Sequence, residues 1–255
     1  MHVLPLKTPT LPPATTTNTI IVSGWVVDPA TPYPEPRATL LAAVREAGAR
    51  GIVLTHHHRD HMGAAAWLAA ETGLPIAAHP RTAELLAGQV TVDVPLHDGD
   101  ELPGAAAWTV LHTPGHASGH IVLWSAVTRE LIAGDMVASV GTIVIDPPDG
   151  HMATYLAQLE RLRALDAALV VPSHGAPITN AHQVFSFYLA HRAERREKVF
   201  AAVTDLPQSL REVTQAAYRD VAPALLPLAE RSALAHLIEL SELGRIRAED
   251  GTWRH

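Results

Sequence analysis

The sequence predicts an α/β fold that carries a metal site, followed by a smaller, mainly helical tail. Short apolar runs typical of buried strands alternate with helical segments through roughly the first 180 residues. Four of these runs end in turns that carry histidine or aspartate, at residues 55–61, 112–116, 134–135 and 173–174. Because ligand sites in such sheet proteins collect just beyond strand ends, the four turns predict one shared site.

The chain before the first of these turns reads as a hairpin and a helix. Residues 18–22 and 24–28 are two apolar runs that favour paired strands. Residues 34–47 favour a helix that Gly48 ends. Residues 1–16, rich in Pro and Thr, give no helical pattern, so a strand and a loose arm both stay open.

The first turn follows a short buried strand at residues 51–54 and carries most of the predicted ligands. Residues two apart in an extended chain project to the same side, so His56 and His58 can reach one ion together. Asp60 and His61 lie further along and suit a second ion beside it. The alternative is a solvated polar loop that is rich in histidine.

The residues that alternate with these ligands are expected to point away from the metals. His57 and Arg59 are the two residues concerned. A crowd of imidazoles and carboxylates cannot be desolvated without a shared partner, and a divalent metal is the partner that this composition favours.

Three other histidines and one tyrosine lie near these turns, and for each of them a structural role is weighed against a role at the metal site. His79, at the end of a strand expected over 75–79, is interpreted as structural. His120 either orients a ligand or is a satisfied core histidine. His151, in a turn-rich loop, is expected at the surface rather than on the substrate. Tyr155 is expected to pack in a helix over 154–165.

The last third of the chain changes character and predicts a second domain. Helices are expected over 183–203, 210–218 and 225–243, followed by a hairpin around Glu249-Asp250-Gly251. Helix, helix and hairpin resemble a winged helix. We therefore predict two domains, a first over 1–180 that carries the metal site and a winged-helix-like domain over 181–255.

Composition sets limits on the class of protein. The 255 residues are 47% hydrophobic and 18% charged, as in ordinary globular proteins. The formal net charge of −7 argues against a whole-molecule attraction to nucleic acid or anionic membranes. Cysteine is absent, so any metal site uses nitrogen and oxygen donors. The chain shows no signal-peptide pattern and no long apolar run, which makes the cytoplasm the expected location and a membrane an unexpected partner.

The order of the motifs resembles the metallo-β-lactamase superfamily of hydrolases. Thr-His-x-His-x-Asp-His begins at residue 55, Thr-Pro-Gly-His at 113, Gly-Asp at 134 and Ser-His-Gly at 173. The resemblance implies a four-layer αββα sandwich with two metals in a groove at one edge. By motif position it implies that the first metal is held by His56, His58 and His116, the second by Asp60, His61 and His174, and both by Asp135.

The resemblance and the donor set together predict a mechanism. Two Zn²⁺ ions would bridge a hydroxide and make it a nucleophile at neutral pH, with Mn²⁺ or Fe as alternative metals. Asp60 is assigned the further catalytic role of holding that hydroxide's proton. The bond cleaved would be an ester or thioester, a lactam or lactone, or a phosphodiester.

The substrate stays open between two classes. The tail resembles that of the β-lactamase-like protein 2 group, whose known members include a single-strand endoribonuclease, whereas the tail pattern of glyoxalase II is not found. A small-molecule substrate and single-stranded nucleic acid are therefore both carried. If the tail binds nucleic acid, its phosphate contacts would come from Arg192, Arg195, Arg196, Lys198, Arg245 and Arg247. A third possibility, a non-catalytic metal sensor or adaptor, would be favoured by loss of a ligand, and all seven positions are filled.

Overall fold

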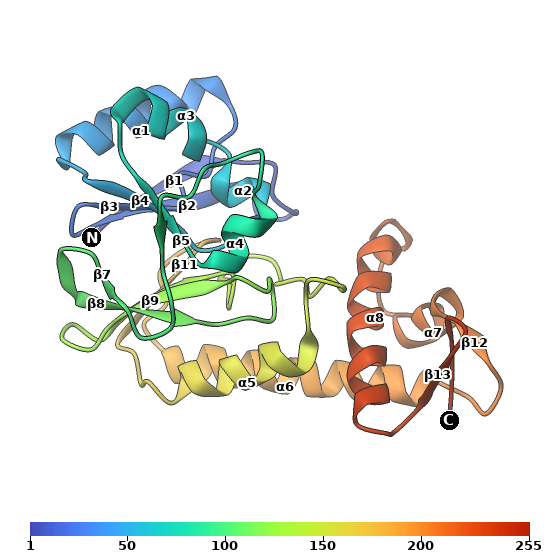
Figure 1. The fold of residues 1–255 in the computed structure, drawn as a ribbon. Coiled ribbons are helices and arrows are strands. Elements are labelled where there is room, and N and C mark those ends of the chain that lie inside the picture. The colour runs from blue at the N-terminus through green and yellow to red at the C-terminus, as the bar shows by residue number, and fades with distance from the viewer. The chain divides into compact units, whose positions relative to one another are not determined.

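The computed structural model describes residues 1–255, which form two compact units (Figure 1). The first unit comprises residues 1–113, 118–143 and 166–181, and the second comprises residues 114–117, 144–165 and 182–255. No helix is both long enough and apolar enough to span a bilayer.

Two β-sheets form the centre of the first unit. The first sheet has the order β1 (His2–Lys7), β2 (Thr16–Val22), β3 (Trp25–Val27), β4 (Gly51–Leu54), β5 (Ile76–Ala78) and β6 (Val94–Pro95). Strands β1 to β3 pair antiparallel, and β3 to β6 pair parallel. Because β3 and β4 are parallel neighbours, the residues that follow them emerge at the same edge of the sheet.

The second sheet has a parallel pair at one side. Its order is β11 (Leu169–Pro172), β10 (Glu130–Gly134), β9 (Ile121–Ser125), β8 (Ala105–His112) and β7 (Glu101–Leu102). Only β10 and β11 are parallel; the other neighbours are antiparallel. Asp135 follows β10 directly and His174 follows β11 by two residues, so both are brought to the same edge.

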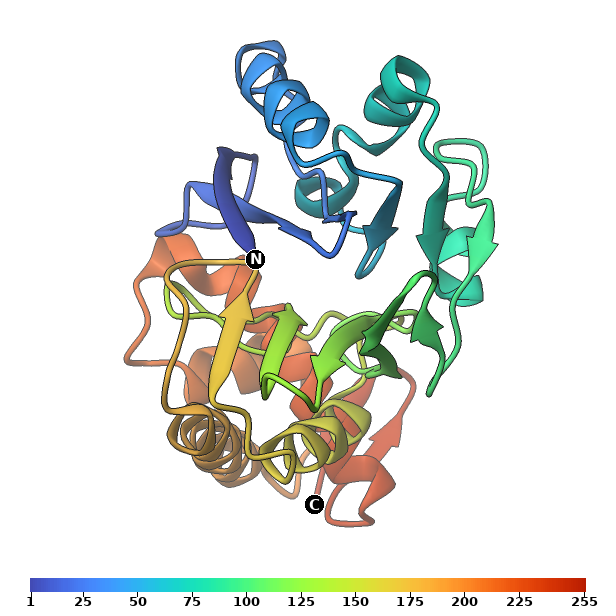
Figure 2. The same cartoon turned by 90° about the vertical axis from the view of Figure 1, so that its left-hand side faces the viewer.

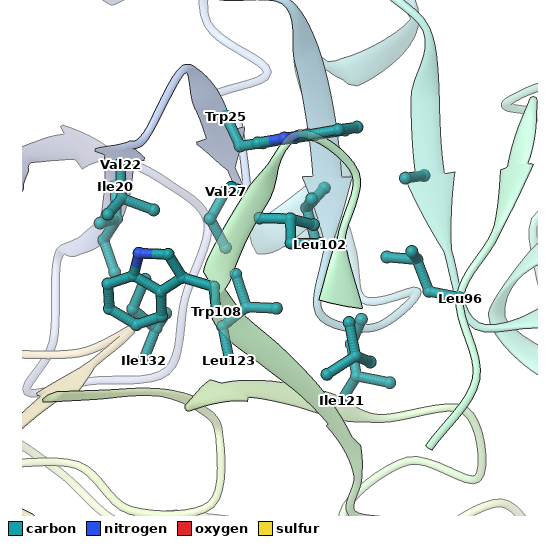
Figure 3. Close-up of a cluster of buried hydrophobic side chains, with 14 of the residues drawn as sticks. Ile20, Val22, Trp25, Val27, Leu96, Leu102, Trp108, Ile121, Leu123 and Ile132 are labelled. Atoms are coloured by element: carbon teal, nitrogen blue, oxygen red, sulfur yellow. The ribbon is translucent and has the colours of Figure 1, made fainter. Parts of the chain in front are cut away.

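The main hydrophobic core lies between the two sheets, which face each other in Figure 2. Alternate residues of a strand face opposite sides of its sheet, so β1 to β5 each contribute to two cores. Figure 3 shows the inner set, in which Ile20, Val22 and Val27 of the first sheet face Trp108 and Ile132 of the second.

The outer face of the first sheet packs on helices. The residues between the inner ones, such as Ile21, Val26 and Ile52, join a second core with Leu40 and Leu68. These two leucines belong to α1 (Pro34–Glu46) and α3 (Ala65–Thr72). The unit also contains two short helices, α2 (Arg59–Met62) and α4 (Pro80–Leu85).

The second unit combines two longer helices with a winged-helix-like arrangement. Its elements are α5 (Met152–Arg163), α6 (Ala181–Ala202), β12 (Gln208–Ser209), α7 (Leu210–Ala217), the 3₁₀ helix η1 (Pro223–Leu225), α8 (Leu226–Glu242), β13 (Arg247–Glu249) and β14 (Thr252–Arg254). A core of Val199, Val213, Leu237 and Trp253 joins α6, α7, α8 and the hairpin. One stripe of α8 is buried at Ala229, Ala233, Leu237 and Leu240, and Leu226 on the same stripe is half-buried.

Most helices predicted from the sequence are found within two residues of their expected ends. Residues 2–7 form a strand, which settles the alternatives for the start of the chain. The extended conformation assumed for the first turn is wrong beyond His58, because Arg59–Met62 form one turn of helix. The predicted division at residue 180 stays a prediction.

Candidate metal centre

Asp28, which follows β3, holds the histidine-rich turn that follows β4. Thr55 donates its backbone N–H and its hydroxyl to the Asp28 carboxylate, each at 2.7 Å. His61 Nδ1 lies 2.8 Å from the same carboxylate, to which it donates its proton. Asp28 is 1% exposed and has a positive φ of 49°, a backbone conformation that aspartate tolerates better than most residues. Sequence analysis gave it no role.

The tautomer of His56 follows from the same network. The single proton of the Thr55 hydroxyl goes to Asp28, so Thr55 Oγ1 accepts from His56 Nδ1, which lies 2.9 Å away. His56 Nε2 is then a lone-pair donor, and it lies 3.0 Å from His58 Nδ1. Two nitrogens of a tetrahedral zinc site lie about 3.3 Å apart, so this pair is placed as two ligands of one ion would be.

A second group of ligand atoms is formed by Asp60, His61 and His174, which lie within 4.8 Å of one another. His61 Nε2 is 3.9 Å from Asp60 Oδ1, and His174 Nε2 is 3.6 Å from Asp60 Oδ2. His56, His61 and Asp135 form a further group by the same measure. Asp135 thus adjoins ligand atoms of both predicted ions.

The electrostatics of the second group favour positive charge. Burial lowers the pKa of His61, but the Asp135 and Asp60 carboxylates outweigh it and raise this pKa well above its usual value. Burial likewise opposes the charge of Asp135, yet His61 and His174 hold its pKa well below the usual range. The carboxylate field that acts on these imidazoles would also attract a divalent cation.

Asp135 is positioned through its backbone. Its N–H donates to His120 Nε2 at 3.0 Å, so His120 carries its proton on Nδ1 and donates it to Thr113 Oγ1 at 2.8 Å. Gly134 has a φ of 52°, and a Cβ there would lie 2.4 Å from His120 Nε2. His120 is thus both a buried histidine and the support of a candidate ligand, which joins the two alternatives left open by the sequence.

His174 is positioned by Asn18 of β2. The Asn18 amide donates to Pro172 O at 2.9 Å and to Gly175 O at 2.8 Å, one carbonyl on each side of His174. His174 Nδ1 donates to Thr16 O at 3.1 Å, which leaves Nε2 for the carboxylates. Sequence analysis placed Asn18 in a strand but gave it no role at the site.

His116 lies in the segment 114–117 of the second unit. Its Nδ1 donates to Val144 O at 2.7 Å, so Nε2 is the nitrogen that could bind a metal. His151, expected at the surface, is part-exposed and caps α5, where its Nδ1 accepts from Thr154 N–H at 3.3 Å. Tyr155 is fully buried, as expected.

The remaining predicted residues lie outside the groups of ligand atoms. His57 and Arg59 belong to none of these groups. His79 caps α4 and stacks on His112 with ring centroids 3.9 Å apart. Burial lowers the pKa of His79 to about 4, so it is neutral, as a structural histidine would be.

The residues at the sheet edge fit a divalent metal. His61 Nε2 is fully buried and makes no hydrogen bond, although two carboxylates lie 3.5 and 3.9 Å away. A buried polar atom without a partner is costly, and a shared cation would satisfy it together with both carboxylates. Two facing sheets with such a cluster beyond their parallel strands thus define a candidate site for divalent metals.

Comparison with known proteins gives the family. A model of the metallo-beta-lactamase superfamily matches residues 16–174, and a model of the beta-lactamase associated winged helix domain matches residues 209–253. The chain belongs to the metallo-beta-lactamase superfamily, whose members are metal-dependent hydrolases that typically bind two metals. The predicted family, enzyme class and winged-helix tail are confirmed.

Two curated relatives show how far the similarity extends. The "Beta-lactamase-like protein 2 homolog" of Drosophila melanogaster is 26% identical over 208 residues, which cover 77% of this chain and 70% of that protein. The "Hydroxyacylglutathione hydrolase" of Methylococcus capsulatus is 37% identical over 144 residues. That match covers 55% of this chain and 52% of the relative, so it spans about half of each.

A solved structure confirms the fold over the whole chain. A metallo-beta-lactamase family protein from Thermus thermophilus superposes with a TM-score of 0.81 at 24% identity. The superposition covers 100% of this chain and 98% of the other. The predicted fold class, a metallo-β-lactamase fold with a winged-helix tail, is therefore confirmed.

Proposed function

We propose that this protein is a dinuclear metal hydrolase that cleaves an acyl bond, such as a thioester, ester or lactone, in a small molecule. The observation that carries the proposal is the convergence of His61 Nε2 and His174 Nε2 on the Asp60 and Asp135 carboxylates. The other nitrogen of each imidazole is held by a fixed acceptor, so both rings are oriented for a metal before one binds.

The seven ligands divide between two ions. In the proposal the first metal is held by His56, His58 and His116, the second by Asp60, His61 and His174, and both by Asp135. The motif order and the imidazole and carboxylate donors support this division. All seven positions carry a ligand, which favours an enzyme over a sensor or adaptor.

The residues of the chain have separate tasks around the metals. When bound, two divalent cations lower the pKa of water and polarise the bond to be attacked. Asp60, whose side chain is 19% exposed, is open enough to accept a proton from the attacking water at a carboxylate oxygen. Asp28, His120 and Asn18 hold the ligands in place and contact no substrate.

Zinc is the proposed metal. A donor set of imidazole and carboxylate without thiolate suits Zn²⁺ and also accepts Mn²⁺ or Fe. Reconstitution with each ion, followed by turnover measurements at equal metal content, separates these choices. Highest turnover with iron or manganese would contradict zinc and leave the dinuclear site intact.

The charges of the tail support a small substrate over RNA. Arg195, Arg196 and Arg245 form ion pairs with Asp220, Glu239 and Glu197 at 3.3, 3.0 and 2.8 Å. Lys198 pairs with Glu194 at 3.0 Å, and Arg192 is 3% exposed. Five of the six residues expected to contact phosphates are thus engaged within their own unit.

The relatives support the same choice without fixing the substrate. The Methylococcus relative is named for the hydrolysis of hydroxyacylglutathione. Its match spans only about half of each chain, so glutathione itself is not part of the proposal. Single-stranded RNA stays the second candidate because the tail resembles that of the β-lactamase-like protein 2 group. The Drosophila relative named for that group matches over 77% of the chain.

A substrate panel tests the proposal. Zinc-loaded protein is assayed with chromogenic thioester, ester, lactone, β-lactam and phosphodiester substrates and with single-stranded RNA. We expect turnover of an acyl substrate that falls about 10²–10⁴-fold in Asp60→Asn, as for loss of a general base. Cleavage of RNA alone, or turnover unaffected by Asp60→Asn, would overturn the proposal.

A further inference from the structure

The segment that carries His116 is held by a neighbouring loop of its own unit, residues 144–151. Val144 O accepts the proton of His116 Nδ1 at 2.7 Å. At the other end of the loop, His151 N–H donates to Gly115 O at 2.7 Å. Two hydrogen bonds thus fix both the ring of His116 and the backbone just before it.

Gly115 allows this segment to lie directly against α5. Its φ is 139°, and a Cβ there would lie 2.3 Å from the Cα of Tyr155. Tyr155 is in the first turn of α5, and the backbone N–H of Tyr155 bonds to His151 O. The position of His116 therefore depends on where the start of α5 and the loop before it are held.

Helix α8 of the winged-helix region contacts this loop at two points. Arg231 pairs with Asp146 at 2.9 Å, and Glu242 lies 3.0 Å from His151 Nε2. His151 Nδ1 accepts from Thr154 N–H, so Nε2 carries the proton that is donated to Glu242. Arg231 and Glu242 are 11 residues apart, about 16 Å along a helix, so α8 contacts the loop at two well-separated points.

A hydrogen-bonded turn lies between these two points of the loop. Gly150 N–H donates to Asp146 O at 2.8 Å, which closes a turn between the Arg231 contact and the His151 contact. A Cβ on Gly150 would lie 2.5 Å from Asp146 N, so the turn is tightly packed. A shift of α8 at either point would therefore displace the loop, and with it the groups of Val144 and His151 that hold the His116 segment.

We propose that helix α8 positions the metal ligand His116 through the loop 144–151, so that the winged-helix region is a support of the metal site. The proposal rests on the proposed function in one respect, the role of His116 as a ligand. It gives the tail a task other than binding nucleic acid. Arg231, Glu242 and Asp146 are positioning residues, since they act on His116 through other groups.

The expected effect is moderate, because both contacts are exposed. The side chains of the Arg231–Asp146 pair are 60% and 45% exposed, and solvent screens such pairs. We expect Arg231→Gln with Glu242→Gln to weaken binding of the first metal by about 2- to 30-fold. Binding of the second metal, whose ligands lie in the first unit, should stay within about twofold.

The test compares full-length variants at equal metal load. Affinities for the two zinc ions are measured by chelator competition in wild type, in the double variant and in Glu230→Gln, a control on the same helix. Arg231→Asp alone should lower the first affinity, and Arg231→Asp with Asp146→Arg should restore it. Equal loss of both metals, an unchanged first affinity, or failure of the reversed pair to restore it would overturn the proposal.

Hydrogen exchange in metal-free protein tests the support independently of metal binding. The amide of His151, bonded to Gly115 O, should exchange about 2- to 30-fold faster in the double variant than in wild type or Glu230→Gln. Unchanged exchange would contradict the proposal. A wild type that binds no metal would contradict the proposed function instead, while this measurement would still decide whether α8 supports the loop.

Discussion

Asp28 decides which nitrogen of His61 faces the candidate metals. Its carboxylate takes the proton of His61 Nδ1 and also holds Thr55, which in turn fixes the tautomer of His56. One buried side chain thus orients a ligand of each proposed ion. Such supports commonly matter to metal affinity nearly as much as the ligands themselves.

Replacement of Asp28 by asparagine tests this role with little change of shape. Asparagine tolerates the positive φ of 49° but offers His61 a neutral acceptor. We expect zinc affinity at the second site to fall about 10- to 100-fold, measured by chelator competition. Asp205→Asn, at an exposed position, is the control and should change nothing. Equal affinities in the two variants would argue against the role.

The residues that hold the ligands in place, Asp28 and Asn18, were harder to predict from the sequence than the ligands themselves. The seven candidate ligands stand in motifs that can be read locally, with characteristic spacing. Asp28 bonds to Thr55, 27 residues away, and Asn18 bonds to Gly175, 157 residues away. Pairing of β3 with β4 brings Asp28 to Thr55, whereas contact between the two sheets brings Asn18 to Gly175, and no local pattern records either.

At the scale of elements, strand order builds the site. Parallel pairing of β3 with β4 brings Asp28 beside the histidine-rich turn, and parallel pairing of β10 with β11 brings Asp135 beside His174. The sequence predicted these strands from their apolar runs. It did not predict the helical turn α2, because four residues between two motifs show no periodicity.

Asn18 joins two of these elements and gives a prediction on stability. Asn18→Ala removes the donor to the buried carbonyl of Pro172 and the donor to the part-buried carbonyl of Gly175. We expect the free energy of unfolding of the metal-free protein to fall by about 2–4 kcal/mol in a urea titration. The exposed amide of Gln89 supplies the control variant, Gln89→Ala, which should stay within about 0.5 kcal/mol. A loss no larger than that of the control would show that the two bonds do not hold the turn.

At the scale of the whole molecule, the charge is divided unevenly. Residues 186–255 carry ten basic and ten acidic side chains, and the preceding part carries nine and sixteen. Most of the tail's arginines form ion pairs within their unit, so the balanced charge reflects internal pairing. The sequence could supply the count but not the pairing, which depends on how α6, α7 and α8 pack.

The buried imidazole of His236, in α8 of the second unit, should make the free energy of unfolding depend on pH. His236 is 0% exposed beside Glu239, with Arg192 and Arg196 of α6 facing it. Burial lowers the pKa of His236 below its usual 6.5, so below about pH 6.5 the unfolded chain binds a proton that the folded chain does not. The free energy of unfolding should therefore decrease as the pH is lowered below about 6.5, by at most about 1.4 kcal/mol per pH unit for this group.

The variant His236→Gln should lack this contribution. Urea unfolding of metal-free protein at pH 7.5 and 5.5 gives the loss of stability for each protein. We expect a smaller loss in His236→Gln than in wild type and an unchanged loss in His255→Gln, at the exposed C-terminal residue. The same loss in all three proteins would mean that His236 is not held neutral.

The central claim is that one edge of the two sheets binds two metals bridged by Asp135. The most direct measurement is metal content per chain by elemental analysis after zinc reconstitution and removal of loose metal, for wild type, Asp135→Ala and His174→Ala. We predict two zinc ions in wild type and a larger loss in Asp135→Ala than in His174→Ala, because the bridging carboxylate also offsets the repulsion between the ions. Only trace metal in wild type, or two ions retained in Asp135→Ala, would contradict the account.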